Sequence, residues 1–225
     1  MEQGILYIVA TPIGNLEDIT LRALRILKEA DVVFCEDTRV TRRLFERHGI
    51  TTHLKSLNAR TESKKIDEVL EHLNNGENVA YVSDAGTPTV SDPGSMLVAR
   101  ARDAGTRVVA IPGASALTAA LSITGVPASE FVFLGFLPHK KGRQTLLKEI
   151  VALDRTVVLY ESTHRILKLL RELETLSMQR KVCLARELTK IHEEVLCGTP
   201  TELHEVLTDT PEKQKGEFVV IIGPR

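Results

Sequence analysis

"VAYVSDAGTPTVSDPG", residues Val79–Gly94, joins an unbroken apolar run to a loop that carries two glycines, two prolines and two aspartates. Such an apolar run is typical of a strand that is buried on both faces of a sheet. The segment Asp92-Pro93-Gly94 is typical of a helix start, and we expect a helix from Pro93 to Asp103. A strand, a loop and a helix in this order predict an α/β fold.

The same alternation continues on both sides of this stretch. Apolar runs at 5–10, 32–35 and 107–111 predict strands, and the helical spacing of apolar residues predicts helices at 21–30, 42–48 and 63–75. Uninterrupted apolar strands between amphipathic helices predict a mostly parallel sheet that is covered on both faces.

The second half of the chain follows a different pattern. After a helix of small residues, five strand candidates alternate with only three helices, and they span residues 131–134, 156–160, 181–185, 193–197 and 218–222. The strands at 181–185 and 193–197 have no helix between them, which predicts antiparallel pairing in a mixed sheet. We therefore expect two α/β domains, residues 1–115 and 116–225.

Composition limits the partners of the protein. The 225 residues are 43% hydrophobic, and 29 basic against 30 acidic residues give a net charge of −1. These values predict a globular core and no general attraction to nucleic acid, so an RNA would have to be bound by a local basic patch. Because neither a targeting signal nor a membrane-spanning stretch is evident, we expect a cytoplasmic protein.

Cysteine and histidine usage favours neither a disulfide framework nor a metal site. Cys35, Cys183 and Cys197 are odd in number and lie within apolar runs, which is typical of buried, reduced thiols. The seven histidines have no metal-ligand spacing, so we expect no metal cofactor.

The two aspartates indicate what the loop of residues 83–94 binds. Glycine after a strand often lets the backbone approach a phosphate, but Asp84 and Asp92 would repel a diphosphate. They would instead favour a cation, an ammonium group or ribose hydroxyls. For Asp92 we favour the role of a helix cap, whereas for Asp84 and Gly86 we favour contact with a ligand.

Polar or glycine-bearing segments follow seven of the predicted strands. They are ATPIGN (10–15), EDTR (36–39), SDAGTPTVSDPG (83–94), IPGAS (111–115), LGFLPHKKGR (134–143), YESTHR (160–165) and ARELTK (185–190). Each one alone can be explained by a helix cap or a turn. Together, at the ends of strands, they predict a binding site.

In this order and spacing, the seven segments resemble the tetrapyrrole methylase superfamily, and more closely its ribosomal RNA branch, across nearly the whole chain. Members that methylate porphyrins carry a glycine-aspartate motif after the first strand and Gly-Asp-Pro after the fourth. Those places hold Thr11–Asn15 and Ser83–Pro88 here, which disfavours a tetrapyrrole substrate.

The resemblance implies a homodimeric methyltransferase that binds S-adenosyl-L-methionine between its two domains. The implied substrate is the 2′-hydroxyl of a decoding-centre cytidine in 16S ribosomal RNA, within the small ribosomal subunit. The cofactor has a sulfonium and an ammonium group but no phosphate, which suits an acidic glycine loop. The residues expected to contact it are Pro12, Asp84, Gly86, Thr87, Pro88, Asp92, Gly94, Ser115, Leu134, Gly135 and Ala185.

Methyl transfer to a ribose hydroxyl needs orientation and removal of a weakly acidic proton. The carboxylates that can act as base are Glu36, Asp37, Glu161 and Glu187, and we prefer Asp37 with Arg39 as a neighbouring clamp. An equally weighted alternative is that Glu36 and Asp37 only cap the following helix.

Phosphate contacts are expected to dominate RNA binding, because the chain has no tryptophan and only 4% aromatic residues. The first choice is the basic loop 139–143, with Lys140, Lys141 and Arg143, although a solvated connection is the alternative. Further candidates are Arg42, Arg43, His164, Arg165 and Lys190. Arg165 can instead be a structural partner of Glu161.

Two other functions stay open: a tetrapyrrole C-methyltransferase and a non-catalytic ribosome-binding factor.

Overall fold

The computed structural model describes residues 3–60, 62–176 and 178–225 of the chain. It divides into two compact units, residues 1–115 and 116–225, and each is described by itself. None of the helices in the described ranges is long and apolar enough to cross a bilayer.

The N-terminal unit is built on a parallel sheet with the strand order β3-β2-β4-β1-β5. Its strands are β1 (Ile5–Val9), β2 (Val32–Cys35), β3 (His53–Ser56), β4 (Val79–Val82) and β5 (Arg107–Ile111). The predicted parallel sheet is confirmed, and β3 is an addition to it. The sequence of β3, HLKS, has no apolar run, because a strand at the edge of a sheet is only partly buried.

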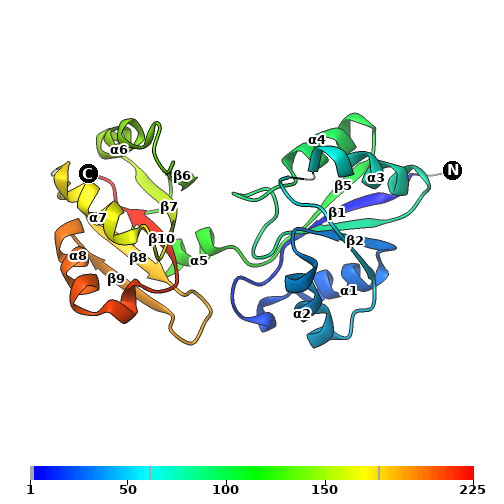
Figure 1. The fold of residues 1–225 in the computed structure, drawn as a ribbon, viewed down its shortest axis with the longest axis horizontal. Coiled ribbons are helices and arrows are strands. Elements are labelled where there is room, and N and C mark those ends of the chain that lie inside the picture. The colour runs from blue at the N-terminus through cyan, green and yellow to red at the C-terminus, as the bar shows by residue number, and fades with distance from the viewer. Residues whose placement is uncertain (1–2, 61, 177) are drawn as a thin grey trace. The chain divides into compact units, whose positions relative to one another are not determined.

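Helices cover both faces of this sheet (Figure 1). They are α1 (Leu21–Glu29), α2 (Thr38–His48), α3 (Glu62–Asn74) and α4 (Ser95–Asp103). One core cluster joins the sheet to α1 and α2, with Leu27 and Phe45 buried, and a second joins it to α3 and α4, with Leu73 and Leu97 buried. Each strand of the centre is therefore apolar on both sides, as β2 and β4 show.

The C-terminal unit contains a mixed sheet with the strand order β6-β7-β10-β8-β9. Its elements are α5 (Ala116–Ile123), β6 (Phe131–Phe136), α6 (Arg143–Ala152), β7 (Thr156–Ser162), α7 (Ile166–Thr175), β8 (Val182–Arg186), β9 (Glu194–Gly198), α8 (Pro200–Asp209) and β10 (Glu217–Ile222). Strands β6 and β7 are parallel, and β10 is antiparallel to both β7 and β8. The core on one face packs against α6, α7 and α8. The predicted antiparallel pair is confirmed as β8 and β9.

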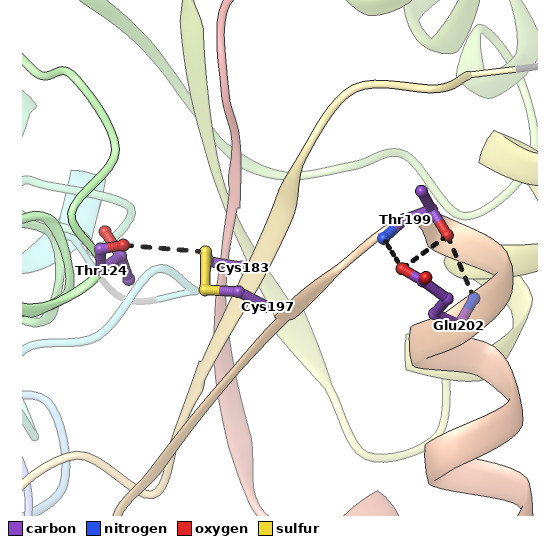
Figure 2. Close-up of a disulfide and its surroundings, with 5 residues drawn as sticks. All are labelled: Thr124, Cys183, Cys197, Thr199 and Glu202. Atoms are coloured by element: carbon purple, nitrogen blue, oxygen red, sulfur yellow. Dashed lines mark hydrogen bonds between the residues drawn. A yellow bond between two sulfur atoms is a disulfide. The ribbon is translucent and has the colours of Figure 1, made fainter.

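The expectation of reduced cysteines is wrong for two of the three. Cys183 of β8 and Cys197 of β9 form a disulfide, because the antiparallel register places them directly opposite each other (Figure 2). The pairing was not evident from the sequence, where 14 positions separate them. Cys35 is the buried thiol that was expected, and burial raises its pKa to about 11.

Reduction of the Cys183–Cys197 disulfide is expected to lower the free energy of unfolding by about 2–4 kcal/mol, because the cross-link restricts the unfolded chain. Urea denaturation with and without dithiothreitol measures this change. A Cys197→Ser variant is the control, since its transition should not respond to the reductant. An unchanged wild-type midpoint under reduction would contradict a stabilising cross-link.

Candidate active site

Three loops meet at the carboxyl edge of the N-terminal sheet. Thr11 follows β1 and Gly86 follows β4. The two residues exchange backbone hydrogen bonds, with nitrogen-to-oxygen distances of 2.9 and 3.0 Å. The Thr11 hydroxyl also donates to the Ser83 carbonyl at 3.2 Å. After β5, the Ala114 carbonyl accepts from the Thr87 hydroxyl at 3.4 Å. The sequence-predicted segments 10–15, 83–94 and 111–115 are therefore tied together.

A fourth loop, which follows β2, joins the same edge through Asp84. The Asp84 Oδ1 accepts a hydrogen bond from the backbone N–H of Asp37 at 2.9 Å. The predicted loops that contain Glu36, Asp84 and Pro12 thus lie at one edge of one sheet, as expected for parallel strands.

Asp37 is the N-cap of α2, as the structural alternative proposed. Its Oδ1 accepts from the backbone N–H of Arg39 at 2.8 Å, and the Arg39 guanidinium pairs with the same carboxylate. The side-chain and backbone hydrogen bonds from Arg39 lower the Asp37 pKa to about 2. A carboxylate with such a low pKa is a weak base, which disfavours the role preferred from the sequence.

Glu36, Asp84 and Asp92 form a cluster of carboxylates that we call the acidic edge. Burial is the largest cause that raises the pKa of all three. Neighbouring carboxylates raise it further, since Asp84 and Asp92 act on Glu36 and Asp84 acts on Asp92. For Asp84, the repulsion by Asp37 is opposed by the Asp37 N–H and by the charge of Arg39, but the pKa is still raised. Among the described residues, no lysine, arginine or histidine forms a salt bridge with any of these three carboxylates. Partly buried like charges without a salt-bridge partner favour a cationic ligand.

The helix-cap role preferred for Asp92 is wrong. Helix α4 begins at Ser95, and its N-cap is Gly94 with φ of 115°. The cap is supplied from α3 instead, because Glu62 Oε1 accepts from the N–H groups of Gly94 and Leu97 at 3.2 and 3.1 Å. The Asp92 carboxylate is therefore free for the acidic edge, where its hydrogen bond with Ser83 partly offsets the rise of its pKa.

The two glycines of the loop have different roles. A Cβ at Gly94 would lie 2.5 Å from the ring of Tyr81, so close packing on β4 explains this glycine. Gly86 has φ of 79°, and its nearest side-chain neighbour is Ile13, 3.4 Å from an added Cβ. Gly86 is thus required by its backbone conformation, next to the acidic edge.

Several predicted site residues lie in the C-terminal unit. Leu134 and Gly135 belong to β6, where the register with β7 is irregular and Gly135 has φ of 60°. Ala185 is buried in β8. Ser115, the last residue of the N-terminal unit, directly precedes α5.

Glu161, Arg165 and Arg143 form a buried charge network inside the C-terminal unit. Glu161 Oε1 accepts from Arg165 Nε at 2.7 Å, and the Arg143 guanidinium lies 3.9 Å from the other Glu161 oxygen. Arg143 also donates from Nε to Glu172 at 2.8 Å. The Glu161 side chain has no exposed surface and that of Arg143 only 3%. Arg165 is therefore the structural partner of Glu161, and Arg143 does not belong to the exposed part of the basic loop.

The other side chains predicted to contact RNA differ in whether they are exposed or held in an ion pair. Lys190 is held between Glu187 and Glu217, at 2.9 Å from each carboxylate. Burial raises the Glu187 pKa, but hydrogen bonds from Lys190 and from the Glu217 backbone outweigh it, so the pKa is lowered. By contrast, the remaining candidates are exposed to solvent: Arg42, Arg43, Lys140, Lys141 and His164.

Sequence reasoning missed Glu62 and Tyr81, which shape the loop from outside it. Tyr81 is fully buried, and burial together with Glu36, Glu62 and Asp92 raises its pKa well above the usual range. The one available signal was a tyrosine in an otherwise aliphatic strand. In the described residues, no group of three or more His, Cys, Asp or Glu side chains is arranged to hold a metal ion.

Comparison with known proteins places these features in a family. The family model of the tetrapyrrole (corrin/porphyrin) methylases matches residues 5–204. A protein of Borrelia garinii subsp. bavariensis named ribosomal RNA small subunit methyltransferase I is 47% identical over 97% of this chain and 98% of its own length. The protein of that name from Thermotoga maritima is 44% identical over 98% of each chain.

Solved structures show the same fold at low sequence identity. A cobalt precorrin-4 methyltransferase of cobalamin biosynthesis gives a TM-score of 0.70 at 18% identity, over 97% of this chain and 94% of that one. A uroporphyrin III C-methyltransferase from Thermus thermophilus gives 0.66 at 20% identity, over 98% and 97%.

Proposed function

Because the chain belongs to the tetrapyrrole methylase family, we propose that it transfers a methyl group from S-adenosyl-L-methionine to ribosomal RNA. The acidic edge of Glu36, Asp84 and Asp92 is the observation that carries the proposal, since it fits a cationic cofactor that lacks phosphate. Relatives that match the chain over nearly its full length are named as methyltransferases of small-subunit ribosomal RNA. The finer proposal is methylation of the 2′-hydroxyl of a decoding-centre cytidine in 16S ribosomal RNA.

The residues at the edge of the N-terminal sheet fit the cofactor. When bound, it supplies an electrophilic methyl group on a positively charged sulfur. Asp84 and Asp92 would attract its positive groups or accept from its ribose hydroxyls. Pro12, Gly86, Thr87 and Pro88 would provide main-chain partners, on loops already fixed by the Thr11–Gly86 pairing.

We propose Glu36 as the base that accepts the proton of the ribose hydroxyl. Its pKa is raised by burial and by three neighbouring carboxylates, so it is a stronger base than Asp37 at neutral pH. Asp37 then has a positioning role, since it fixes the start of α2 and offers its N–H to Asp84. Arg39, whose side chain is 86% exposed, stays a candidate for contact with an RNA phosphate.

The decisive experiment is mass spectrometry of nucleosides after incubation with S-adenosyl-L-methionine. Small subunits and naked 16S ribosomal RNA from cells that lack the modification serve as substrates, and the expected product is 2′-O-methylcytidine. Methylation of uroporphyrinogen instead would support the tetrapyrrole enzyme. RNA binding with no methylated product would support the ribosome-binding factor.

Asp84→Asn is expected to weaken S-adenosyl-L-methionine binding roughly 10- to 100-fold, because it removes a charged hydrogen-bond partner from the site. Gly86→Val should weaken it as well, since valine is strained at φ of 79°. Isothermal titration calorimetry without divalent metal measures both. Gly49→Ala, at the end of α2 with φ of 60° and open space around it, is the control for strain alone. Unchanged affinity in Asp84→Asn would remove this loop from the cofactor site.

The affinity for the cofactor is expected to rise as the pH increases through the raised pKa values of Asp84 and Asp92. In the cofactor-free protein the pKa values of Asp84 and Asp92 are raised, so these carboxyls keep protons above their ordinary range of about 4. A bound cation favours the ionised form, so binding releases protons. Calorimetry in buffers with different ionisation enthalpies measures the release, and Asp92→Asn should reduce it.

The raised pKa values of Asp84 and Asp92 also determine whether the cofactor-free protein becomes more or less stable as the pH rises. A carboxyl whose pKa is raised by folding adds stability below its unfolded pKa, and this contribution is lost as pH rises through the folded pKa. The cofactor-free protein should thus gain stability at neutral pH from Asp92→Asn, even as it loses affinity.

A further inference from the structure

A shallow pocket of about 400 Å³ lies along α7 of the C-terminal unit. It is lined by residues of α7 and by the residue two positions before the helix: His164, Leu167, Lys168, Arg171, Glu172 and Thr175. Lys168 and Arg171 are three positions apart on α7, so their side chains share one face, and His164 of the preceding turn lines the same pocket. The pocket is therefore an open groove along a helix with basic groups on one side.

The charge of this groove is positive because its acid is already paired. Glu172 accepts hydrogen bonds from Arg143 at 2.8 Å and from Gln144 at 3.1 Å. Lys168 and Arg171 are exposed, and neither forms a salt bridge with a described residue. Arg171 Nε instead donates to His204 Nε2 of α8 at 2.9 Å, so the neutral His204 ring holds the guanidinium in place without cancelling its charge.

The groove continues into the basic loop that precedes α6. Arg165, at the start of α7, donates from Nη1 to the Leu137 carbonyl at 3.0 Å, and Arg143 donates to the Pro138 carbonyl at 3.3 Å. These bonds fix the loop of residues 137–142 beside the start of α7. The exposed lysines Lys140 and Lys141 belong to this loop.

We propose that the α7 groove, defined by His164, Lys168, Arg171 and His204, binds the phosphodiester backbone of the RNA substrate. The inference rests on the proposed function. It adds an anchoring surface that holds flanking RNA through phosphates. Lys168 and Arg171, two exposed cations without a carboxylate partner among the described residues, suit a polyanion, and the pocket lining includes no Phe, Tyr or Trp side chain on which a base could stack.

The test measures RNA binding of Lys168→Ala/Arg171→Ala with a 16S ribosomal RNA fragment between 50 and 200 mM salt. Loss of two phosphate contacts should reduce the slope of log affinity against log salt by about 1.4 to 1.8 and weaken binding at least roughly tenfold at low salt. Arg171→Lys should keep most of the slope, because it keeps the charge. Cofactor affinity and melting temperature should stay at wild-type values.

The matched control is Arg22→Ala/Lys28→Ala, which removes two exposed basic side chains from α1. It should leave the salt slope unchanged. A wild-type slope in the groove variant, or an equal loss in the control, overturns the inference while leaving the proposed function intact. Wild-type protein that neither binds nor methylates the RNA overturns both.

Discussion

Glu36→Gln is expected to lower the rate of methyl transfer about 10²- to 10⁴-fold in single-turnover reactions saturated with cofactor and RNA. Burial and the charges of Asp84, Asp92 and Asp37 raise the pKa of Glu36, which makes it the better proton acceptor of the two neighbouring carboxylates. Saturation separates this loss from weaker cofactor binding. The wild-type rate should rise with pH as Glu36 loses its proton in the complex, and the variant should lose this rise.

Asp37→Asn is the matched comparison, because it changes the adjacent carboxylate of the same loop in the same way. It should weaken the cap of α2 and the pair with Arg39, yet keep the rate within a few-fold. The opposite result, a slow Asp37→Asn and a normal Glu36→Gln, would restore Asp37 as the base that the sequence favoured.

Glu161→Ala is expected to destabilise the C-terminal unit by about 3–5 kcal/mol, because it leaves buried arginine charge without its partner. Arg165 would lose the 2.7 Å contact to Glu161, and Arg143 would keep Glu172 as its carboxylate partner. Urea denaturation followed by circular dichroism measures the change. Because Glu161→Ala is predicted to act through stability alone, the rate of methyl transfer by the protein that stays folded should be near normal.

Glu130→Ala controls for loss of an ion pair at the surface. Its partner Arg155 lies 3.4 Å away and both side chains are more than half exposed, so its removal should cost at most about 1 kcal/mol. If Glu161→Ala is as stable as this control but inactive, Glu161 acts in catalysis, as the sequence suggested.

The order of strands and helices followed from local patterns, because each buried strand is apolar on both faces and each helix carries one apolar stripe. The pattern failed at β3, whose sequence HLKS reflects its place at the sheet edge. It also failed to pair Cys183 with Cys197, since that depends on the register of two strands. Register also depends on the geometry of the connection between the strands, which local spacing does not give.

In the candidate site, too, part of the structure could be predicted from the sequence and part could not. Its loops were found because parallel strands bring their carboxyl ends to one edge. The roles of single side chains were less accessible, because they depend on distant partners. Asp92 has the residue type of a helix cap, but Glu62, 30 positions earlier, supplies that cap. Arg143 is part of a basic run, but Glu161 and Glu172 hold it in the interior.

The two anchors of the loop after β4 limit how this enzyme can be redesigned. Near its start, Gly86 is paired with Thr11, and at its end Gly94 is fixed by Glu62 and by the ring of Tyr81. Loop insertions usually cost little when the two ends only have to meet, but here each end has its own partners. The stretch between Pro88 and Asp92 is thus the part in which length can vary, and Thr89 and Ser91 within it have positive φ values that a substitution to glycine would relieve of strain.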